Sequence, residues 1–232
     1  MIPITSRVDW PRTFRLVRSI YPPVDLFEDI ADPADWEPIV AAEAKTDLRM
    51  RDQVGAIQLV PPQRRVSGPG ATRAMAPFCH VSLDRPSRFS DGTYGVYYAG
   101  DRLEVALAET LYHFQRFMSA TDEEPSIADY RELVGRLEAD FHDLRGPPAF
   151  GTELDADDYA AAQSLARMLR NDHASNGIVY PSVRDPAGEA VAVFWPDIVG
   201  ISVPGRRICY RWDGHRADAW LMYGDDHWHS LP

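Results

Sequence analysis

The sequence predicts an α+β fold, with a mixed or largely antiparallel sheet as its core and helices flanking that sheet. Short runs of β-branched and aromatic residues recur through the second half of the chain, and several are separated by tight turns, as in antiparallel hairpins. Two longer segments with apolar residues at helical spacing lie among these strands. Because strands and helices do not alternate regularly, a doubly wound α/β fold is not expected.

A single domain is expected to fill the chain, with a mainly helical part over residues 1–60 and a catalytic core over residues 77–223. Pro and Gly punctuate residues 61–76, which predicts a long loop between the two parts. The other elements expected around this loop are an apolar segment at 14–20, helices at 26–30 and 35–44, and strands at 56–60 and 77–83.

The stretch from residue 88 to 109 combines a turn, a short strand and the start of a helix. Aromatic and β-branched residues at 94–98 predict the strand, and Asp101 and Glu104 have the spacing of a capping box. Glu109 points away from the apolar stripe of the helix, so it is either an ordinary surface acid or a placed carboxylate. The stripe itself consists of Leu103, Leu107, Leu111, Phe114 and Met118.

The remaining elements are predicted from period and turn signals. Residues 137–144 alternate between apolar and polar side chains, which indicates a half-buried strand. Residues 155–170 begin with acids, end with bases and have one apolar face, as a helix does. Two hairpins are expected, one pairing 178–180 with 190–195 and one pairing 208–212 with 219–223.

Composition and charge limit the classes of function. The 232 residues have a net charge of −11, which disfavours stand-alone nucleic-acid binding. No apolar run is long enough to cross a membrane, and the N-terminus has no secretory signal pattern. Two cysteines make no disulfide framework, so a reducing cytoplasm fits best.

Several common chemistries lack their sequence patterns. Neither GxGxxG nor GxxxxGK[ST] occurs, and there is no G-x-S-x-G around Ser182, which lacks an obvious base. The histidines are scattered, so no metal site is expected. Cys79 has the character of a buried, inert thiol.

One combination in the 88–109 stretch offers a chemistry of its own. Arg88 could grip a diphosphate through paired hydrogen bonds, and a tyrosine on the following strand could stack on a flat aromatic cation. Glu109 could hold a ribose hydroxyl and stabilise a transition state like an oxocarbenium ion. On the residues alone, solvated surface charges remain the alternative interpretation.

Segments spread over about residues 15–212 together resemble the RES-domain toxins of bacterial toxin–antitoxin pairs. These segments are, in order, YPPVDLFEDIAD, VGAIQLVPPQRRVSGPG, PSRFSDGTYGVYYAGDRLEVALAETLYH, FHDLRG and SNGIVYPSVRDPAGEAVAVFWP. The resemblance places the Arg, Glu and Ser that name the family at Arg88, Glu109 and Ser182. It places the family's active-site tyrosine at Tyr98, with Tyr97 as the alternative register.

The resemblance implies an ADP-ribosyltransferase-like fold, a cytoplasmic toxin and NAD+ as the substrate, without a metal. Members of the family deplete NAD+ by hydrolysis or phosphorolysis, or transfer ADP-ribose to phosphoribosyl pyrophosphate synthetase. The implied partner is an antitoxin with an Xre-type (Cro/cI) helix-turn-helix region, which would carry any DNA binding. The segments before residue 60 are the expected place of a homodimer or toxin–antitoxin contact.

The resemblance also implies roles for the matched residues. Glu109 would bond the hydroxyls of the nicotinamide ribose and offset the charge that builds on that ring. Arg88 would bind the diphosphate or a ribose hydroxyl, and Tyr98 would pack on the nicotinamide. Ser182 would fix the ribose or position Glu109.

Two further residues are secondary candidates for binding NAD+, and the acceptor stays open. His80 lies in an expected strand, Phe78-Cys79-His80, like the first-strand histidine of diphtheria-class ADP-ribosyltransferases; a structural histidine is the alternative. Arg73 is a second candidate for the diphosphate. Residues of the donor site do not encode the acceptor, so hydrolysis, phosphorolysis and transfer remain alternatives, as does a catalytically silent binding module.

Overall fold

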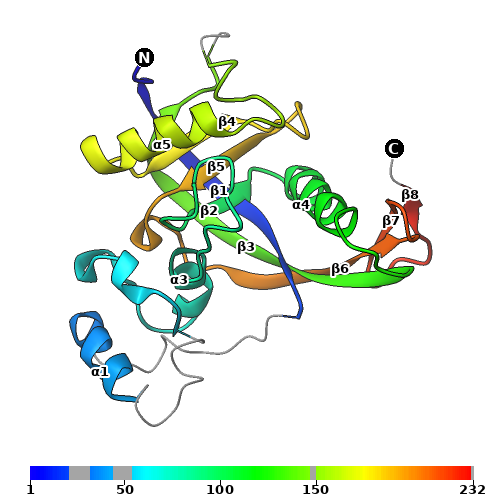
Figure 1. Cartoon of the computed structure of the whole chain (residues 1–232), viewed down its shortest axis with the longest axis horizontal. Helices are drawn as coiled ribbons and strands as arrows, with labels where there is room; N and C mark the ends of the chain where they lie inside the picture. Colours follow the sequence, from blue (N-terminus) through cyan, green and yellow to red (C-terminus); the bar gives the residue numbers. More distant parts are fainter. Residues whose placement is uncertain (21–31, 44–53, 147–149, 231–232) are drawn as a thin grey trace.

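Two long strands, β1 (Thr5–Arg18) and β3 (Ser126–Asp143), form the spine of the protein. The computed structural model describes residues 1–20, 32–43, 54–146 and 150–230 (Figure 1). Within these residues the strands form one eight-stranded sheet in the order β1-β2-β5-β4-β3-β6-β7-β8. The other elements are β2 (Tyr97–Gly100), β4 (Gly177–Pro181), β5 (Glu189–Val193), β6 (Val203–Trp212), β7 (Ala217–Met222), β8 (His229–Ser230), α1 (Trp36–Glu43), α3 (Ala71–Cys79), α4 (Leu103–Met118) and α5 (Ala160–Asp172).

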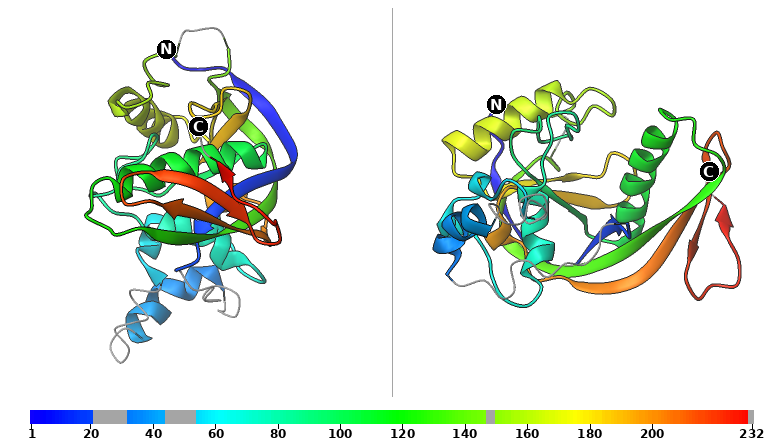
Figure 2. Two further views of the ribbon diagram at one scale, coloured as in Figure 1. Left: turned by 90° about the vertical axis from the view of Figure 1, so that its right-hand side faces the viewer. Right: turned by 60° about the horizontal axis from the view of Figure 1, so that its bottom comes forward.

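The sheet is mixed, as predicted. β3 and β4 run parallel, and the other strand pairs in the described residues are antiparallel. β1 pairs with β3 along its length and also meets β2 at Phe14 and Gly100, so β1, β2, β5, β4 and β3 are connected in a closed cycle. β3 continues past this cycle to pair with β6, and the two form a long curved ribbon (Figure 2).

The expected helical part over residues 1–60 is wrong for residues 5–18, which form β1. The pairing that makes this segment a strand is non-local: Arg18 lies opposite Tyr130 on β3. A break in register between Trp10 and Thr13 interrupts the alternation, and Pro11, which has no N–H to donate, lies inside it. The helix expected at 35–44 is confirmed as α1, and the one at 26–30 lies outside the described residues.

Two expected strands and part of the expected loop are also different. Residues 57–59 form a 3₁₀ turn, and residues 71–79 form α3, so the strand expected at 77–83 is wrong. Pro77 hides this helix in the sequence, although Ala71, Ala74 and Phe78 keep helical spacing and are buried.

α3 and α5 cover opposite faces of the paired strands β4 and β5 (Figure 1). Val179 and Val191 pack with α3 in one cluster, whereas Ile178 and Ala192 pack with α5 in the other. Neighbouring residues therefore face opposite sides, and both sides are buried, which explains the continuous apolar runs in these strands. Both predicted hairpins, β4–β5 and β6–β7, are confirmed.

α4 packs the predicted apolar stripe against β1, β3, β6 and β7. The predicted capping box is not formed: the N-cap residue is Arg102, without a side-chain cap. The Asp101 carboxylate instead accepts the Glu189 N–H at 3.0 Å, which fixes the β2–α4 junction to β5. Gly100 allows the start of α4 to lie close to β2, because a Cβ at this position would lie 2.7 Å from Val105 on α4. None of the described helices is long and apolar enough to cross a membrane.

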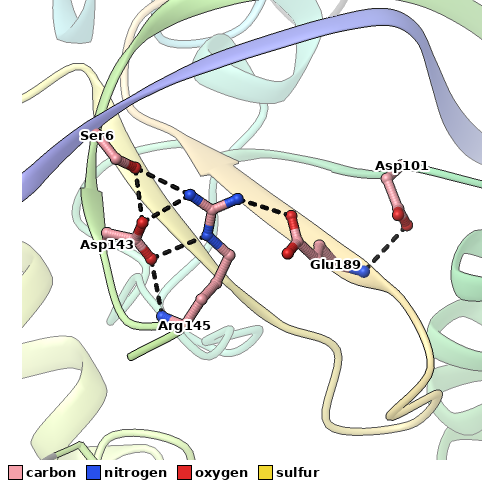
Figure 3. A network of polar contacts seen from close by, with 5 residues as sticks. All are labelled: Ser6, Asp101, Asp143, Arg145 and Glu189. Carbon is pink, nitrogen blue, oxygen red and sulfur yellow. Dashed lines mark hydrogen bonds and ion pairs between the residues drawn. The ribbon is translucent and has the colours of Figure 1, made fainter. Parts of the chain in front are cut away.

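A polar network ties β1, β3 and β5 together at one end of the sheet (Figure 3). Arg145 donates to both carboxylate oxygens of Asp143, at 2.9 and 2.6 Å, and to Glu189 at 2.8 Å. Ser6 on β1 donates to Asp143 at 2.6 Å. Despite partial burial, the hydrogen bonds from Arg145 and Ser6 lower the pKa of Asp143 to about 2.

The strand predicted at 137–144 is confirmed as part of β3, with one exception in its alternation. Leu137, Ala139 and Phe141 are buried as expected. His142, expected on the polar face, is also buried, and its Nδ1 shares a 2.8 Å hydrogen bond with the Ser175 hydroxyl.

Candidate functional site

A cavity of about 350 Å³ opens between α4 and the strands β1 and β2. Its floor comes from strands of the closed cycle, one wall from α4, and another from residues 86–88 and the segment before α5. Three residues singled out in the sequence, Arg88, Tyr98 and Glu109, line this cavity together. They lie within 22 residues of one another, but the turn, strand and helix between them fold so that all three face the same space.

Ser182 does not line the cavity itself but bonds Glu109, which does. The Ser182 hydroxyl donates to Glu109 Oε1 at 2.9 Å. The Oγ of Ser182 in turn accepts hydrogen bonds from the backbone N–H groups of Arg184 at 3.3 Å and Asp185 at 3.0 Å. Two backbone donors on the oxygen leave its proton for the carboxylate. Ser182 is 3% exposed, so the turn after β4 binds the Glu109 carboxylate from the buried side.

Arg88 is 6% exposed and is held by the segment before α5. Its Nη1 donates to the carbonyl of Asp155, and its guanidinium lies over the Tyr159 ring, 4.7 Å from the centroid. No salt bridge to a carboxylate is found for Arg88 within the described residues. Its positive charge is therefore not neutralised there and faces a ligand-sized space.

Tyr98, not Tyr97, faces the cavity. The Tyr98 hydroxyl accepts the Phe89 N–H at 3.0 Å and shares a 2.8 Å hydrogen bond with Ser87. Burial raises the pKa of Tyr98 to about 12, so the phenol stays neutral at physiological pH. Tyr97 is 2% exposed and packs in the core on the α3 side, so Tyr98 is the one of the two tyrosines that lines the cavity.

A second arginine, Arg15, lines the cavity and was missed in the sequence. It projects from β1, donates to the carbonyl of Tyr98 at 2.9 Å, and lies 4.8 Å from the centre of the Tyr97 ring. Burial lowers the pKa of Arg15, but an arginine remains charged in proteins. The one available signal was an arginine flanked by Phe14 and Leu16 in an apolar run.

Two further titratable groups, His113 and Tyr180, lie on the cavity wall. His113 lies on α4 one turn after Glu109 and is exposed at the mouth, with Tyr112 edge-on to it at 5.3 Å. Tyr180 on β4 is 3% exposed, and burial raises its pKa well above the usual range. Neither was singled out in the sequence, because nothing marks them before α4 and β4 are placed side by side.

The two secondary candidates do not line the cavity. Arg73 lies on α3 and donates to the carbonyl of Ser202 at 3.0 Å. His80 is the C-cap residue of α3 and is exposed, so the expectation of a histidine on a first strand is wrong. Cys79 is buried as expected, and burial raises the pKa of its thiol to about 12.

No group of three or more His, Cys, Asp or Glu side chains suited to a metal ion is present in the part of the chain that the structure describes. The polar side chains around the cavity instead offer guanidiniums, hydroxyls, one imidazole and one carboxylate. Such a set suits an organic ligand that has both anionic and hydroxyl groups.

The sequence profile of the RES domain matches residues 62–213, about two thirds of the chain. The chain belongs to the RES domain family. A curated relative, the uncharacterized protein y4oC of Sinorhizobium fredii, is 25% identical over 217 residues, which cover 92% of this chain and 87% of y4oC. The matched RES segment contains Arg88, Tyr98, Glu109 and Ser182, whereas Arg15 lies before it.

Proposed function

We propose that this RES protein binds NAD+ in the cavity and cleaves the bond between nicotinamide and ribose, in the manner of an ADP-ribosyltransferase. The observation that carries the proposal is the hydrogen bond from Ser182 to Glu109 at the wall of a cavity that also contains two arginines. A carboxylate held in this way is fixed before substrate arrives, which is the condition for electrostatic stabilisation of a transition state.

The charges suit the parts of NAD+. The diphosphate is anionic and fits the guanidiniums of Arg15 and Arg88, which can each offer paired donors. Nicotinamide in NAD+ is already a cation, so it leaves without a general acid. The positive charge that then builds on the ribose would be offset by Glu109, and the neutral ring of Tyr98 would pack against the nicotinamide.

We further propose that the protein acts as the toxin of a toxin–antitoxin pair, with an Xre-type helix-turn-helix protein as its partner. Membership of the RES family and the net charge of −11, which leaves DNA binding to a partner, support this part. The neighbouring gene should encode a helix-turn-helix protein, and co-expression of that protein should restore growth of cells that express the RES protein. If the two proteins neither bind nor affect growth together, the pairing is refuted and the NAD+ chemistry is left standing.

The test of the chemistry is the fate of labelled NAD+. The purified protein, incubated with NAD+ labelled in the nicotinamide, should release free nicotinamide. Glu109→Gln keeps the size of the side chain and a hydrogen-bond acceptor for Ser182 but removes the charge, and should lower the rate by about 10²–10³. The matched control is Glu104→Gln, which changes an exposed acid on the same helix that does not line the cavity.

A wild-type protein that binds NAD+ but releases no nicotinamide would refute catalysis and favour a binding module. A Glu109→Gln protein that is as active as wild type would refute the assignment of the carboxylate. The same reaction with inorganic phosphate, and then with cell extract, distinguishes ADP-ribose, ADP-ribose-1-phosphate and a labelled protein as products.

A further inference from the structure

The acceptor of the ADP-ribosyl group can be approached from the cavity wall on which Glu109 lies. We propose that His113 is the general base that takes a proton from the acceptor, and that the acceptor is consequently water or another neutral hydroxyl. The inference rests on the proposed NAD+ chemistry and adds to it a residue and an acceptor class.

His113 has the position that such a base needs. It follows Glu109 by four residues on α4, so the two side chains are neighbours on one helix face, with Cβ atoms about 5–6 Å apart. Both line the cavity. Glu109 is half-buried and fixed by Ser182, whereas His113 is exposed at the mouth, where an acceptor from solvent enters.

Other titratable groups of the described cavity wall are less suited to the task, and the ring of Tyr159 is covered on one face by the Arg88 guanidinium. Tyr98 and Tyr180 have raised pKa values, so their hydroxyls hold their protons. Arg15 and Arg88 are permanent cations and have no lone pair to offer. Glu109 already accepts a hydrogen bond from Ser182 and is needed beside the developing positive charge.

The surroundings of His113 keep its ring neutral. Desolvation lowers its pKa most, Glu109 on the same helix raises it, and three arginines lower it further. These are Arg184 from the turn after β4, Arg116 on α4 and Arg88 from the segment before β2. A neutral imidazole at pH 7 has a free lone pair, as a general base requires.

The step balances without a further reagent. The bond between C1′ of the ribose and the nicotinamide nitrogen breaks, and nicotinamide leaves with the electron pair. The oxygen of water forms a bond to C1′ and gives one proton to the His113 ring. The products are ADP-ribose and nicotinamide, and the imidazolium returns its proton to solvent. A phosphate dianion could attack without a base, so a base at this position favours a protonated acceptor.

The experiment compares water with azide, an anionic nucleophile that has no proton to lose. In phosphate-free buffer, His113→Ala should lower hydrolysis of NAD+ by about 10²–10⁴, the usual contribution of general base catalysis. Added azide should restore NAD+ consumption in His113→Ala through an azide adduct of ADP-ribose, and should change the wild-type rate little. The wild-type rate should rise with pH through a titration that is missing in His113→Ala.

His215→Ala is the matched control, since His215 is an exposed histidine in the β6–β7 turn and does not line the cavity. Three results would overturn the inference: full hydrolysis by His113→Ala, no rescue by azide, or a wild-type protein that consumes NAD+ in the presence of phosphate alone. Each is distinct from failure of the proposed function, in which the wild-type protein releases no nicotinamide with any acceptor.

Discussion

Replacement of Ser182 by alanine tests how the site is held together. The substitution removes one hydrogen bond to the Glu109 carboxylate, of 2.9 Å, and one acceptor for the N–H groups of Arg184 and Asp185. A hydrogen bond to a charged group contributes about 1.5–3 kcal/mol. If that energy orients Glu109 for the transition state, the rate of NAD+ cleavage should fall by about 10- to 150-fold.

The same change should lower the free energy of unfolding. Two backbone donors lose their partner near a side chain that is 3% exposed, and an unsatisfied buried group costs about 1–3 kcal/mol. Urea denaturation measures this loss. Ser175→Ala is the control for stability, because Ser175 is also a buried serine with backbone partners, and it bonds His142 away from the cavity.

A double-mutant cycle decides whether Ser182 acts through Glu109. Nicotinamide release is measured for wild type, Ser182→Ala, Glu109→Ala and the double variant. If Ser182 only positions the carboxylate, its loss should matter little once Glu109 is absent, so the two effects should be far from additive. Additive losses would refute the reasoning and would make Ser182 an independent contact of the substrate. A rate for Ser182→Ala that equals wild type would refute it as well.

Four further outcomes are expected. Arg15→Ala should raise the KM for NAD+ at least tenfold, as loss of a charge-assisted contact predicts, whereas Arg73→Ala should leave KM unchanged in the same assay. Asp143, with a pKa of about 2 against an ordinary 3.8, favours the folded state by about 2 kcal/mol above pH 4 and loses that contribution as the pH falls towards 2. Between pH 4 and pH 2 the melting temperature should therefore fall less steeply with pH for Asp143→Asn than for wild type. Equal slopes would contradict the network in Figure 3. Gly100→Ala would place a Cβ 2.7 Å from Val105 on α4, so it should push α4 away from β2 and reduce nicotinamide release more than it lowers the melting temperature. Deletion of residues 1–18 should prevent folding, as seen by circular dichroism, because β1 pairs with both β2 and β3; a folded truncated protein would contradict this pairing.

Local sequence patterns predicted those elements whose apolar spacing and turn residues lie within the element itself. α4, α5 and the β6–β7 hairpin follow from apolar spacing and a turn signal, and each is found within a few residues of its expected bounds. β1 could not be found in this way, because its partners lie more than 80 residues away along the chain. α3 was hidden by Pro77, which is usually a sign that a helix has ended.

The residues of the candidate site follow the same rule: those close together in the sequence were predicted, and one that depends on long-range strand pairing was not. Arg88, Tyr98 and Glu109 are close in sequence, and the family resemblance added Ser182, which the structure brings to Glu109. Arg15 was missed because it reaches the cavity through the pairing of Phe14 with Gly100, a contact that no local pattern encodes.

The strand β1 has a consequence for synthesis of the protein. β1 ends at Arg18, and Ser182, which fixes Glu109, is translated about 160 residues later, roughly 8–32 s at ordinary translation rates. In the later part of that interval the nascent chain contains Arg15, Arg88 and Glu109 without the turn that orients the carboxylate. The proposed cleavage of NAD+ should therefore appear only after Ser182 has been translated, and chains that terminate before this turn should release no nicotinamide.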